Sequence, residues 1–291
     1  MELAGARFIE DAKSRHLAVE TTNKYKLMFK EMGDFFGKKE LKHISVDDLS
    51  AYRNTWKMAP ITSLKKLERL KAFLGFCKAR GWVKENRAVF LKTPKTMFAP
   101  TLPFDAGEWE KILWATEVFP IKGIYGEFNR TRLKAFVMLL RYTGLRIRDA
   151  VMLKREHLDI EDKIFLYQQK TGTPVWIPVP HELAKLIDEV WRRNKDRDYF
   201  FWSGLGNAKS AVGDWQRTLR KLHGLAGVKG HAHMYRDTFA VDLLQKGVPI
   251  ETVSIPLGHS SIRITEKHYS PWVKSRQDNL ETQIRKIWIS S

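Results

Sequence analysis

Residues 143–150 read Thr-Gly-Leu-Arg-Ile-Arg-Asp-Ala and follow an apolar stretch, about residues 131–142, with the spacing of a strong helix. Gly144 is expected to end that helix, which places Arg146 at the turn into the next one. An arginine at such a turn can aim its planar guanidinium at a phosphate, with backbone amides close by. Taken alone the pattern is weak, because an exposed arginine at a helix junction is an ordinary feature of helical proteins.

After this turn the spacing of the apolar residues changes from that of helices to that of strands. Short runs at 158–160 (Leu-Asp-Ile), 163–168 (Lys-Ile-Phe-Leu-Tyr-Gln) and 174–179 (Pro-Val-Trp-Ile-Pro-Val) predict strands, and the last two read as a hairpin. Lys170 lies at the expected tip of that hairpin, next to Thr171 and Gly172. It is an ordinary turn lysine by itself, although a hairpin tip would let it reach into a groove of DNA.

Helices are expected again from about residue 181, and two short patterns stand out among them. His233 and Arg236 are three residues apart, so both lie on one face of a helix and can donate to two oxygens of one phosphate. A capping histidine beside a surface arginine is an equally good interpretation. Residues 257–261, Leu-Gly-His-Ser-Ser, place His259 in a tight turn that caps a new helix.

Tyr269 is the last residue of interest, in the sequence Thr-Glu-Lys-His-Tyr-Ser-Pro-Trp at 265–272. A tyrosine hydroxyl, with an ordinary pKa of about 10, is a poor nucleophile. It becomes a good one where neighbouring cations stabilise the charge that develops during attack. A lone tyrosine at a helix end is more often structural.

Taken in this order and with these gaps, the five patterns resemble the tyrosine recombinases, also called the phage integrase family. The resemblance covers nearly the whole chain. It implies a mainly α-helical fold with a small antiparallel β-sheet, in two domains. Residues 1–85 would form a helical, SAM-like core-binding domain, residues 86–104 a linker, and residues 105–291 a mixed α/β catalytic domain with a C-terminal tail helix.

The resemblance also implies a mechanism for cutting and rejoining DNA without metal, cofactor or ATP. Tyr269 would attack the scissile phosphate, forming a 3′-phosphotyrosyl bond and releasing a 5′-hydroxyl. Arg146 and Arg236 would clamp the non-bridging oxygens. Lys170 would act as the general acid that protonates the leaving 5′-oxygen.

Three further residues receive implied roles. His233 would assist as a donor or proton acceptor, His259 would hydrogen-bond a non-bridging oxygen, and Asp149 would orient these side chains from behind, through a histidine or arginine. The sequence also departs from the family pattern, because Asp237 follows Arg236 where another histidine is common. This departure leaves the hydrogen bonding around Arg236 open, but not the nucleophile.

The net charge of +18 is concentrated in residues 51–100, which hold twelve Lys and Arg against two acidic residues. A helix expected from Thr62 or Ser63 to Gly81 has one apolar and one basic face. A solvated surface would explain a charge run, yet the near-absence of acids favours contact with a phosphate backbone. The residues we expect to bind DNA are Lys65, Lys66, Arg69, Lys71, Arg53 and Lys57.

Composition excludes other classes and leaves some alternatives open. The single cysteine allows no internal disulfide and no cysteine-based zinc site. The N-terminus does not read as a signal peptide, and no apolar run is long enough for a membrane span. We expect double-stranded DNA as the partner, no membrane, and the bacterial cytoplasm or nucleoid as the location. A catalytically silent DNA-binding protein and a type IB topoisomerase remain alternatives.

The family resemblance also raises the question of assembly. It implies a dimer on each DNA site and a tetramer in synapsis. Residues 272–288 contain a short amphipathic tail with two tryptophans, which could pack on its own domain or on a neighbouring subunit. Because the chain starts almost directly at the first helical domain, we expect no arm-binding domain. We expect DNA recombination and integration in a mobile element, although the sequence does not distinguish integration from excision or dimer resolution.

Overall fold

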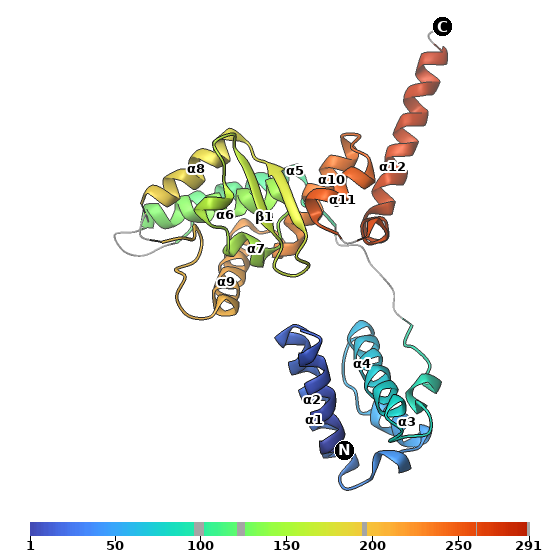
Figure 1. The fold of residues 1–291 in the computed structure, drawn as a ribbon. Coiled ribbons are helices and arrows are strands. Elements are labelled where there is room, and N and C mark those ends of the chain that lie inside the picture. The colour runs from blue at the N-terminus through green and yellow to red at the C-terminus, as the bar shows by residue number, and fades with distance from the viewer. Residues whose placement is uncertain (96–101, 121–125, 194–196, 260, 290–291) are drawn as a thin grey trace. The chain divides into compact units, whose positions relative to one another are not determined.

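The computed structural model describes residues 1–95, 102–120, 126–193, 197–259 and 261–289, although few side chains beyond Tyr269 are described. The chain divides into two compact units, Met1–Ala99 and Pro100–Ser291 (Figure 1). No helix in these described ranges is both long enough and apolar enough to cross a membrane.

Residues 1–95, the described part of the first unit, form four α-helices and two single 3₁₀ turns. Their bounds are α1 Glu2–Ser14, α2 Val19–Phe36, η1 Leu41–His43, α3 Val46–Asn54, α4 Pro60–Ala79 and η2 Arg87–Phe90. Phe8, Met28 and Phe73 lie in their common core, where aromatic rings meet edge to face. A capping box opens α3, because Ser45 Oγ accepts from the Asp48 amide and the Asp48 carboxylate accepts from the Ser45 amide.

The connection after α4 differs from the linker that we expected from residue 86. Ala88 and Leu91 are buried in the core of the first unit, and Arg87 Nη1 donates to the Ile44 carbonyl at 2.6 Å. At the other end, Phe104 is buried in the second unit, where its amide donates to Thr238 Oγ1. A single four-residue 3₁₀ turn has no helical period to recognise, which is why the sequence suggested an extended segment.

Lys66 does not belong to the basic face on which we placed it. It is 7% exposed, its Nζ lies 2.5 Å from Glu31 Oε2, and its ammonium group lies over the rings of Tyr52 and Trp56. The reason is helical spacing, because position 66 shares a stripe with the buried Leu70 at i+4. A buried, paired lysine is a poor phosphate ligand, so this part of the expected footprint is corrected.

The other expected DNA-binding residues are more accessible. Lys65 and Lys57 are exposed, and Arg69 and Lys71 are half-buried on α4. Arg53 is also half-buried and donates from Nη1 to the Lys92 carbonyl at 2.5 Å. The footprint that remains is therefore Lys65, Arg69, Lys71, Lys57 and, in part, Arg53.

Replacing Lys66 by alanine is expected to lower the free energy of unfolding by about 1–2 kcal/mol, because a buried ion pair and two ring contacts are lost. Lys65→Ala on the exposed face is the matched control and should change stability by less than about 0.5 kcal/mol. Urea unfolding of the full chain measures both values. Equal effects of the two substitutions would contradict the buried placement of Lys66.

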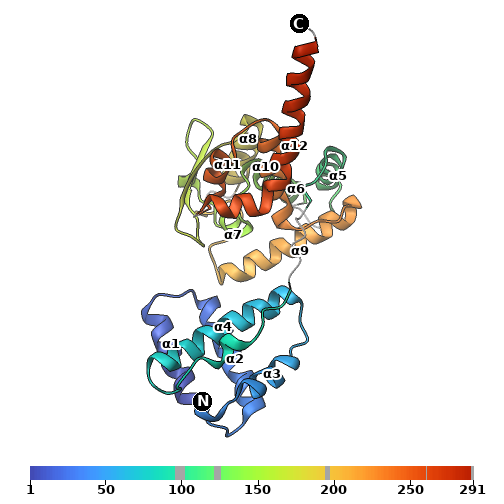
Figure 2. The same ribbon diagram turned by 90° about the vertical axis from the view of Figure 1, so that its right-hand side faces the viewer.

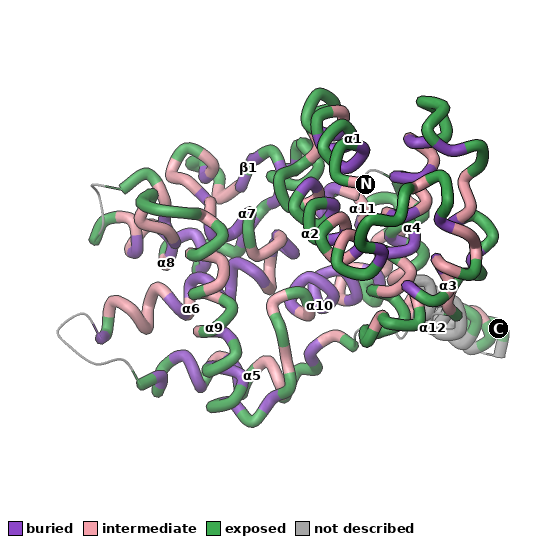
Figure 3. The backbone as a smooth tube through the Cα atoms, turned by 90° about the horizontal axis from the view of Figure 1, so that it is seen from below, coloured by how far each residue is buried: buried purple, intermediate pink, exposed green. Residues whose placement is uncertain are grey.

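The second unit is mainly helical with one small sheet, as the sequence indicated. Its elements are α5 Ala106–Glu117, α6 Gly126–Thr143, α7 Ile147–Val151, η3 Arg155–His157, β1 Lys163–Tyr167, β2 Pro174–Pro178, α8 His181–Arg192, α9 Ala208–Ala226, α10 Ala232–Gln245, α11 Ile250–Leu257 and α12 Ile262–Ile289. Buried residues gather on α6 and α10 (Figure 3), and α6 packs against α5, α8 and α10. A capping box between Asp105 and Glu108 opens α5.

The predicted hairpin is confirmed. β1 and β2 pair antiparallel with Phe165 opposite Trp176, and the turn between them contains Lys170. The first expected strand, at 158–160, is reduced to one isolated bridge between Leu158 and Ile164. Beyond the sheet, α10, α11 and the start of α12, three successive helices, pack together (Figure 2).

Candidate active site

Arg146 is positioned by a tight turn at the end of α6. Gly144 has a φ of +61°, and a Cβ there would lie 2.5 Å from a ring carbon of Phe239, so only glycine fits. The turn makes Arg146 the N-cap of α7, half-buried, with its Nη1 donating to Gln168 Oε1. Burial lowers the pKa of Arg146, and the charge of Asp149 opposes that shift.

Arg236 lies deeper, 1% exposed on α10. Its Nη1 donates to the Gly144 carbonyl at 2.7 Å, and its Nη2 donates to the Leu257 carbonyl at 2.5 Å and to His259 Nε2 at 2.9 Å. Burial, followed by the charge of Arg146, lowers the pKa of Arg236 to about 10, so the group stays charged at neutral pH. Because these acceptors are neutral, the positive charge remains available to an anion.

Gln168 connects the two arginines. Its side chain is buried, its Oε1 accepts from Arg146, and its Nε2 donates to the Leu257 carbonyl at 3.1 Å. That same carbonyl accepts from Arg236, so hydrogen bonds through Gln168 and the Leu257 carbonyl link the guanidinium groups of Arg146 and Arg236. Gly258 lies against the Gln168 side chain and has a φ of +57°. A Cβ at this position would lie 2.4 Å from Gln168 Oε1, so a side chain would displace Gln168.

His259 follows directly after this glycine and is held from both sides. Its Nε2 accepts from Arg236, and its Nδ1 lies 2.8 Å from Thr265 Oγ1. Because arginine only donates, Nε2 carries no proton and Nδ1 is the protonated nitrogen of the neutral ring. Burial and the charges of both arginines lower the pKa of His259 to about 3, which agrees with a neutral ring. Donation from Nε2 to a phosphate therefore requires protonation, which the phosphate charge would favour.

Lys170 and His233 line a cavity of about 550 Å³ together with Arg146, Arg220 and His231. Both Lys170 and His233 are exposed, and they come from the β1–β2 turn and the start of α10. The structure thus brings three sequence-predicted residues to one concave, cationic surface. An anionic ligand is the complementary partner of such a surface.

Asp149 acts at a different place from the one we expected. Its Oδ1 accepts from the Gln169 amide at 2.9 Å, which anchors the turn immediately before Lys170. Burial raises the pKa of Asp149, and the Gln169 hydrogen bond and the charge of Arg146 oppose this shift. Asp149 therefore orients the lysine-bearing turn through a backbone bond, and touches the arginines only through their charge.

Tyr269 is 3% exposed near the start of α12. Its hydroxyl donates to Asp237 Oδ1 at 2.7 Å. Burial, together with the charge of Asp237 and this hydrogen bond, raises the pKa of Tyr269 above its ordinary value. Asp237 and Gln168 are the two residues that the sequence did not assign, although the unusual acid after Arg236 was a visible signal for the first.

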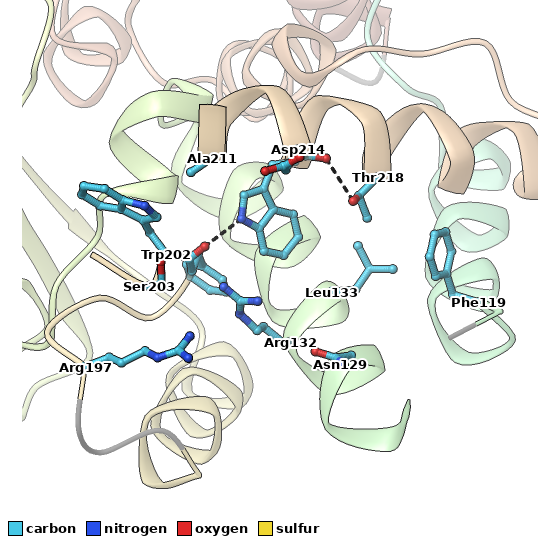
Figure 4. A pocket seen from close by; sticks show the side chains of 12 residues that line it. Phe119, Asn129, Arg132, Leu133, Arg197, Trp202, Ser203, Ala211, Asp214 and Thr218 are labelled. Carbon is cyan, nitrogen blue, oxygen red and sulfur yellow. Dashed lines mark hydrogen bonds between the residues drawn. The ribbon is translucent and has the colours of Figure 1, made fainter. Parts of the chain in front are cut away.

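A second cavity, of about 430 Å³, lies elsewhere in this unit (Figure 4). Arg132, Arg197 and Trp202 line it, and Trp215 in its wall donates from Nε1 to the Phe201 carbonyl. The residues that the sequence predicted for catalysis lie outside its lining.

Residues 105–274 match the model of the phage integrase family, and this range contains every residue of the candidate active site. The chain belongs to the phage integrase family. Tyrosine recombinase XerA of Pyrococcus furiosus is 31% identical over 231 residues, which cover 75% of this chain and 74% of that protein.

Other phage integrase relatives are matched over less of their length. A XerC-like tyrosine recombinase of Caldanaerobacter subterraneus is 27% identical over 259 residues, which cover 76% of this chain and 64% of that protein. A probable integrase/recombinase of Acholeplasma phage L2 is 28% identical over 151 residues, or 50% and 52% of the two chains. The chain therefore spans less than two thirds of these two relatives.

Solved structures of the family share the fold. A lambda integrase (75–356) dimer bound to a COC′ core site aligns with a TM-score of 0.74 at 17% identity, covering 92% of this chain and 94% of that one. XerH bound to a palindromic difH substrate in a post-cleavage complex aligns with a TM-score of 0.73 at 20% identity, covering 93% and 81%.

Proposed function

We propose that this chain is a site-specific DNA recombinase that cuts and rejoins DNA through a 3′-phosphotyrosyl bond at Tyr269. The observation that carries the proposal is Arg236, a buried guanidinium held by neutral acceptors and linked through Gln168 and the Leu257 carbonyl to Arg146. Two fixed cations that converge on one place suit the charge of a phosphate in its pentavalent transition state.

Each proposed role uses a contact described above. Arg146 and Arg236 clamp the non-bridging oxygens, and His259, between Arg236 and Thr265, adds a third donor once it is protonated. Lys170 protonates the 5′-oxygen as it leaves, from a turn that Asp149 anchors. Because the phosphotyrosyl bond keeps the energy of the broken bond, a second 5′-hydroxyl can reverse the step on another strand without ATP.

In this proposal the chain contacts duplex DNA through the basic residues of the first unit, chiefly Lys65 and Arg69 on α4. Assembly is proposed as a dimer on each site and a tetramer in synapsis. Family structures support this assembly, because they include a lambda integrase dimer bound to a core site and a tetramer bound to a Holliday junction. Trp288, 72% exposed near the end of α12, supports a contact with another copy.

Trapping a covalent adduct tests this function. Sheared DNA of the source organism, nicked at random, is incubated with the full chain, and protein-bound DNA is recovered after denaturation and sequenced. A nick close to the cleavage point lets the short 5′-hydroxyl strand diffuse away, so the phosphotyrosyl intermediate accumulates. We expect adducts at one recurring sequence, joined through Tyr269 in the peptide map, and none with Tyr269→Phe.

Two other results would each exclude the proposal. DNA binding without any adduct would indicate a catalytically silent DNA-binding protein. Adducts spread over unrelated sequences, with relaxation of supercoiled plasmid and no recombinant products, would indicate a topoisomerase.

A further inference from the structure

A hydrogen bond joins Tyr269, the expected nucleophile, to Asp237, the residue at which the sequence departs from the family pattern. The two residues lie 32 positions apart, on α10 and α12, and both side chains are buried. At 2.7 Å, the Tyr269 hydroxyl is within the reach that proton transfer needs. The hydrogen of this hydroxyl points at a carboxylate oxygen rather than at solvent.

One oxygen of the Asp237 carboxylate makes no hydrogen bond in the described part of the chain. This oxygen, Oδ2, is buried. His233 Nε2 lies 3.9 Å from Oδ1, beyond hydrogen-bond distance. A carboxylate oxygen in this position can accept a proton or a further hydrogen bond.

Tyr269 needs such an acceptor. Burial and Asp237 keep its pKa above the ordinary value, so the tyrosine meets the phosphate as a neutral phenol and has to lose its proton during attack. The neighbouring arginines only donate. His259 Nε2 already accepts from Arg236. The Asp237 oxygen is the acceptor already in contact with the hydroxyl.

We propose that Asp237 is the general base for Tyr269, a catalytic role that rests on the proposed recombinase function. As the Tyr269 oxygen bonds to phosphorus, its O–H bond breaks and the proton moves to Asp237 Oδ1. The bond from phosphorus to the 5′-oxygen breaks, and that oxygen takes a proton from Lys170. In rejoining, Asp237 returns its proton to the leaving tyrosine oxygen and Lys170 accepts the proton of the attacking 5′-hydroxyl.

The test measures single-turnover cleavage of the DNA sequence recovered by adduct trapping, with the full chain. Asp237→Asn keeps the size of the side chain but cannot accept a proton, so cleavage is expected to fall about 100-fold. DNA affinity should stay within about twofold, because Asp237 contacts Tyr269 rather than the exposed surface. Asp237→Glu, which keeps a carboxylate, should retain more activity than Asp237→Asn. Asp214→Asn, at an exposed acid on α9, is the matched control and should cleave normally.

Two chemical substitutions separate a base from a merely structural partner. Trifluorotyrosine at position 269 lowers the pKa of the phenol, so it should restore a large part of the cleavage lost in Asp237→Asn. A DNA substrate with sulfur in place of the bridging 5′-oxygen needs no acid, so it should rescue Lys170→Ala and leave Asp237→Asn slow.

Several outcomes would overturn the role of Asp237. Unchanged cleavage in Asp237→Asn would mean that the contact is only structural, and faster cleavage would mean that it restrains the tyrosine. A slow variant that trifluorotyrosine does not improve would also point to structure. If the parent chain forms no adduct with any DNA, the proposed function fails first, and the role of Asp237 fails with it.

Discussion

Arg236→Ala is expected to lower single-turnover DNA cleavage by about 10³- to 10⁵-fold, the range observed when an arginine that stabilises a phosphoryl transition state is removed. The magnitude follows from burial, because this guanidinium is 1% exposed and acts where water screens its charge little. Its loss also removes the donor to the Gly144 carbonyl and to His259 Nε2, and leaves the Leu257 carbonyl with Gln168 as its remaining donor. Each unsatisfied buried acceptor costs about 1–3 kcal/mol, so stability should fall as well.

Arg236→Lys separates charge from geometry. The ammonium group keeps the positive charge but cannot reach three acceptors from a planar fork, so a large part of the cleavage loss should remain. Arg192→Lys, at an exposed arginine paired with Asp188 on α8, is the matched control and should cleave normally. Cleavage rates and thermal melting of the four chains give the answer. Full activity in Arg236→Lys would show that charge alone suffices and would contradict the role given to the fork.

Gly258→Ala is the second substitution with a large expected effect. The new Cβ would lie 2.4 Å from Gln168 Oε1 and would have to be accommodated at a φ of +57°. Overpacking of this kind typically costs about 1–3 kcal/mol. The displaced Gln168 amide would release both Arg146 and the Leu257 carbonyl. A shift of about 1 Å in a catalytic group can cost about 10²-fold, so cleavage should fall by at least that factor.

Gly227→Ala provides the control for the backbone. Gly227 also ends a helix in the left-handed region, with a φ of +66°, but a Cβ there meets nothing within 4 Å. It should therefore show only the modest cost of a positive φ and normal cleavage. Adding Gln168→Ala to Gly258→Ala should recover stability without recovering cleavage. If Gly258→Ala and Gly227→Ala behave alike, steric contact with Gln168 is not what requires the glycine.

Local signals in the sequence were sufficient for several elements. The hairpin with Lys170 at its turn lies where the sequence placed it, and the capping boxes at Ser45 and Asp105 are likewise local patterns. The residues that interact are three positions apart in each capping box and 7 to 15 positions apart in the hairpin. Lys66 shows the limit even here, because a single polar residue on an apolar stripe reads as exposed until its partner Glu31 is known.

The bonds of the candidate site join residues far apart in sequence. Arg236 bonds to Gly144 across 92 positions, and Gln168 bonds to Leu257 across 89. The order of the motifs could indicate which residues carry the chemistry. No local pattern predicts that Gln168 bonds both Arg146 and the Leu257 carbonyl, or that Asp149 accepts from a backbone amide. Asp237 was visible as a departure from the family pattern, and only its contact with Tyr269 gives it a role.

The role of the Leu257 carbonyl cannot be tested by changing side chains. This carbonyl accepts from Arg236 and from Gln168, and a peptide oxygen of this kind persists whatever side chain occupies position 257. An alanine scan of α11 would therefore leave this atom in place and report nothing about it. An ester linkage between residues 257 and 258, which weakens the acceptor while keeping every side chain, is the substitution that reaches it.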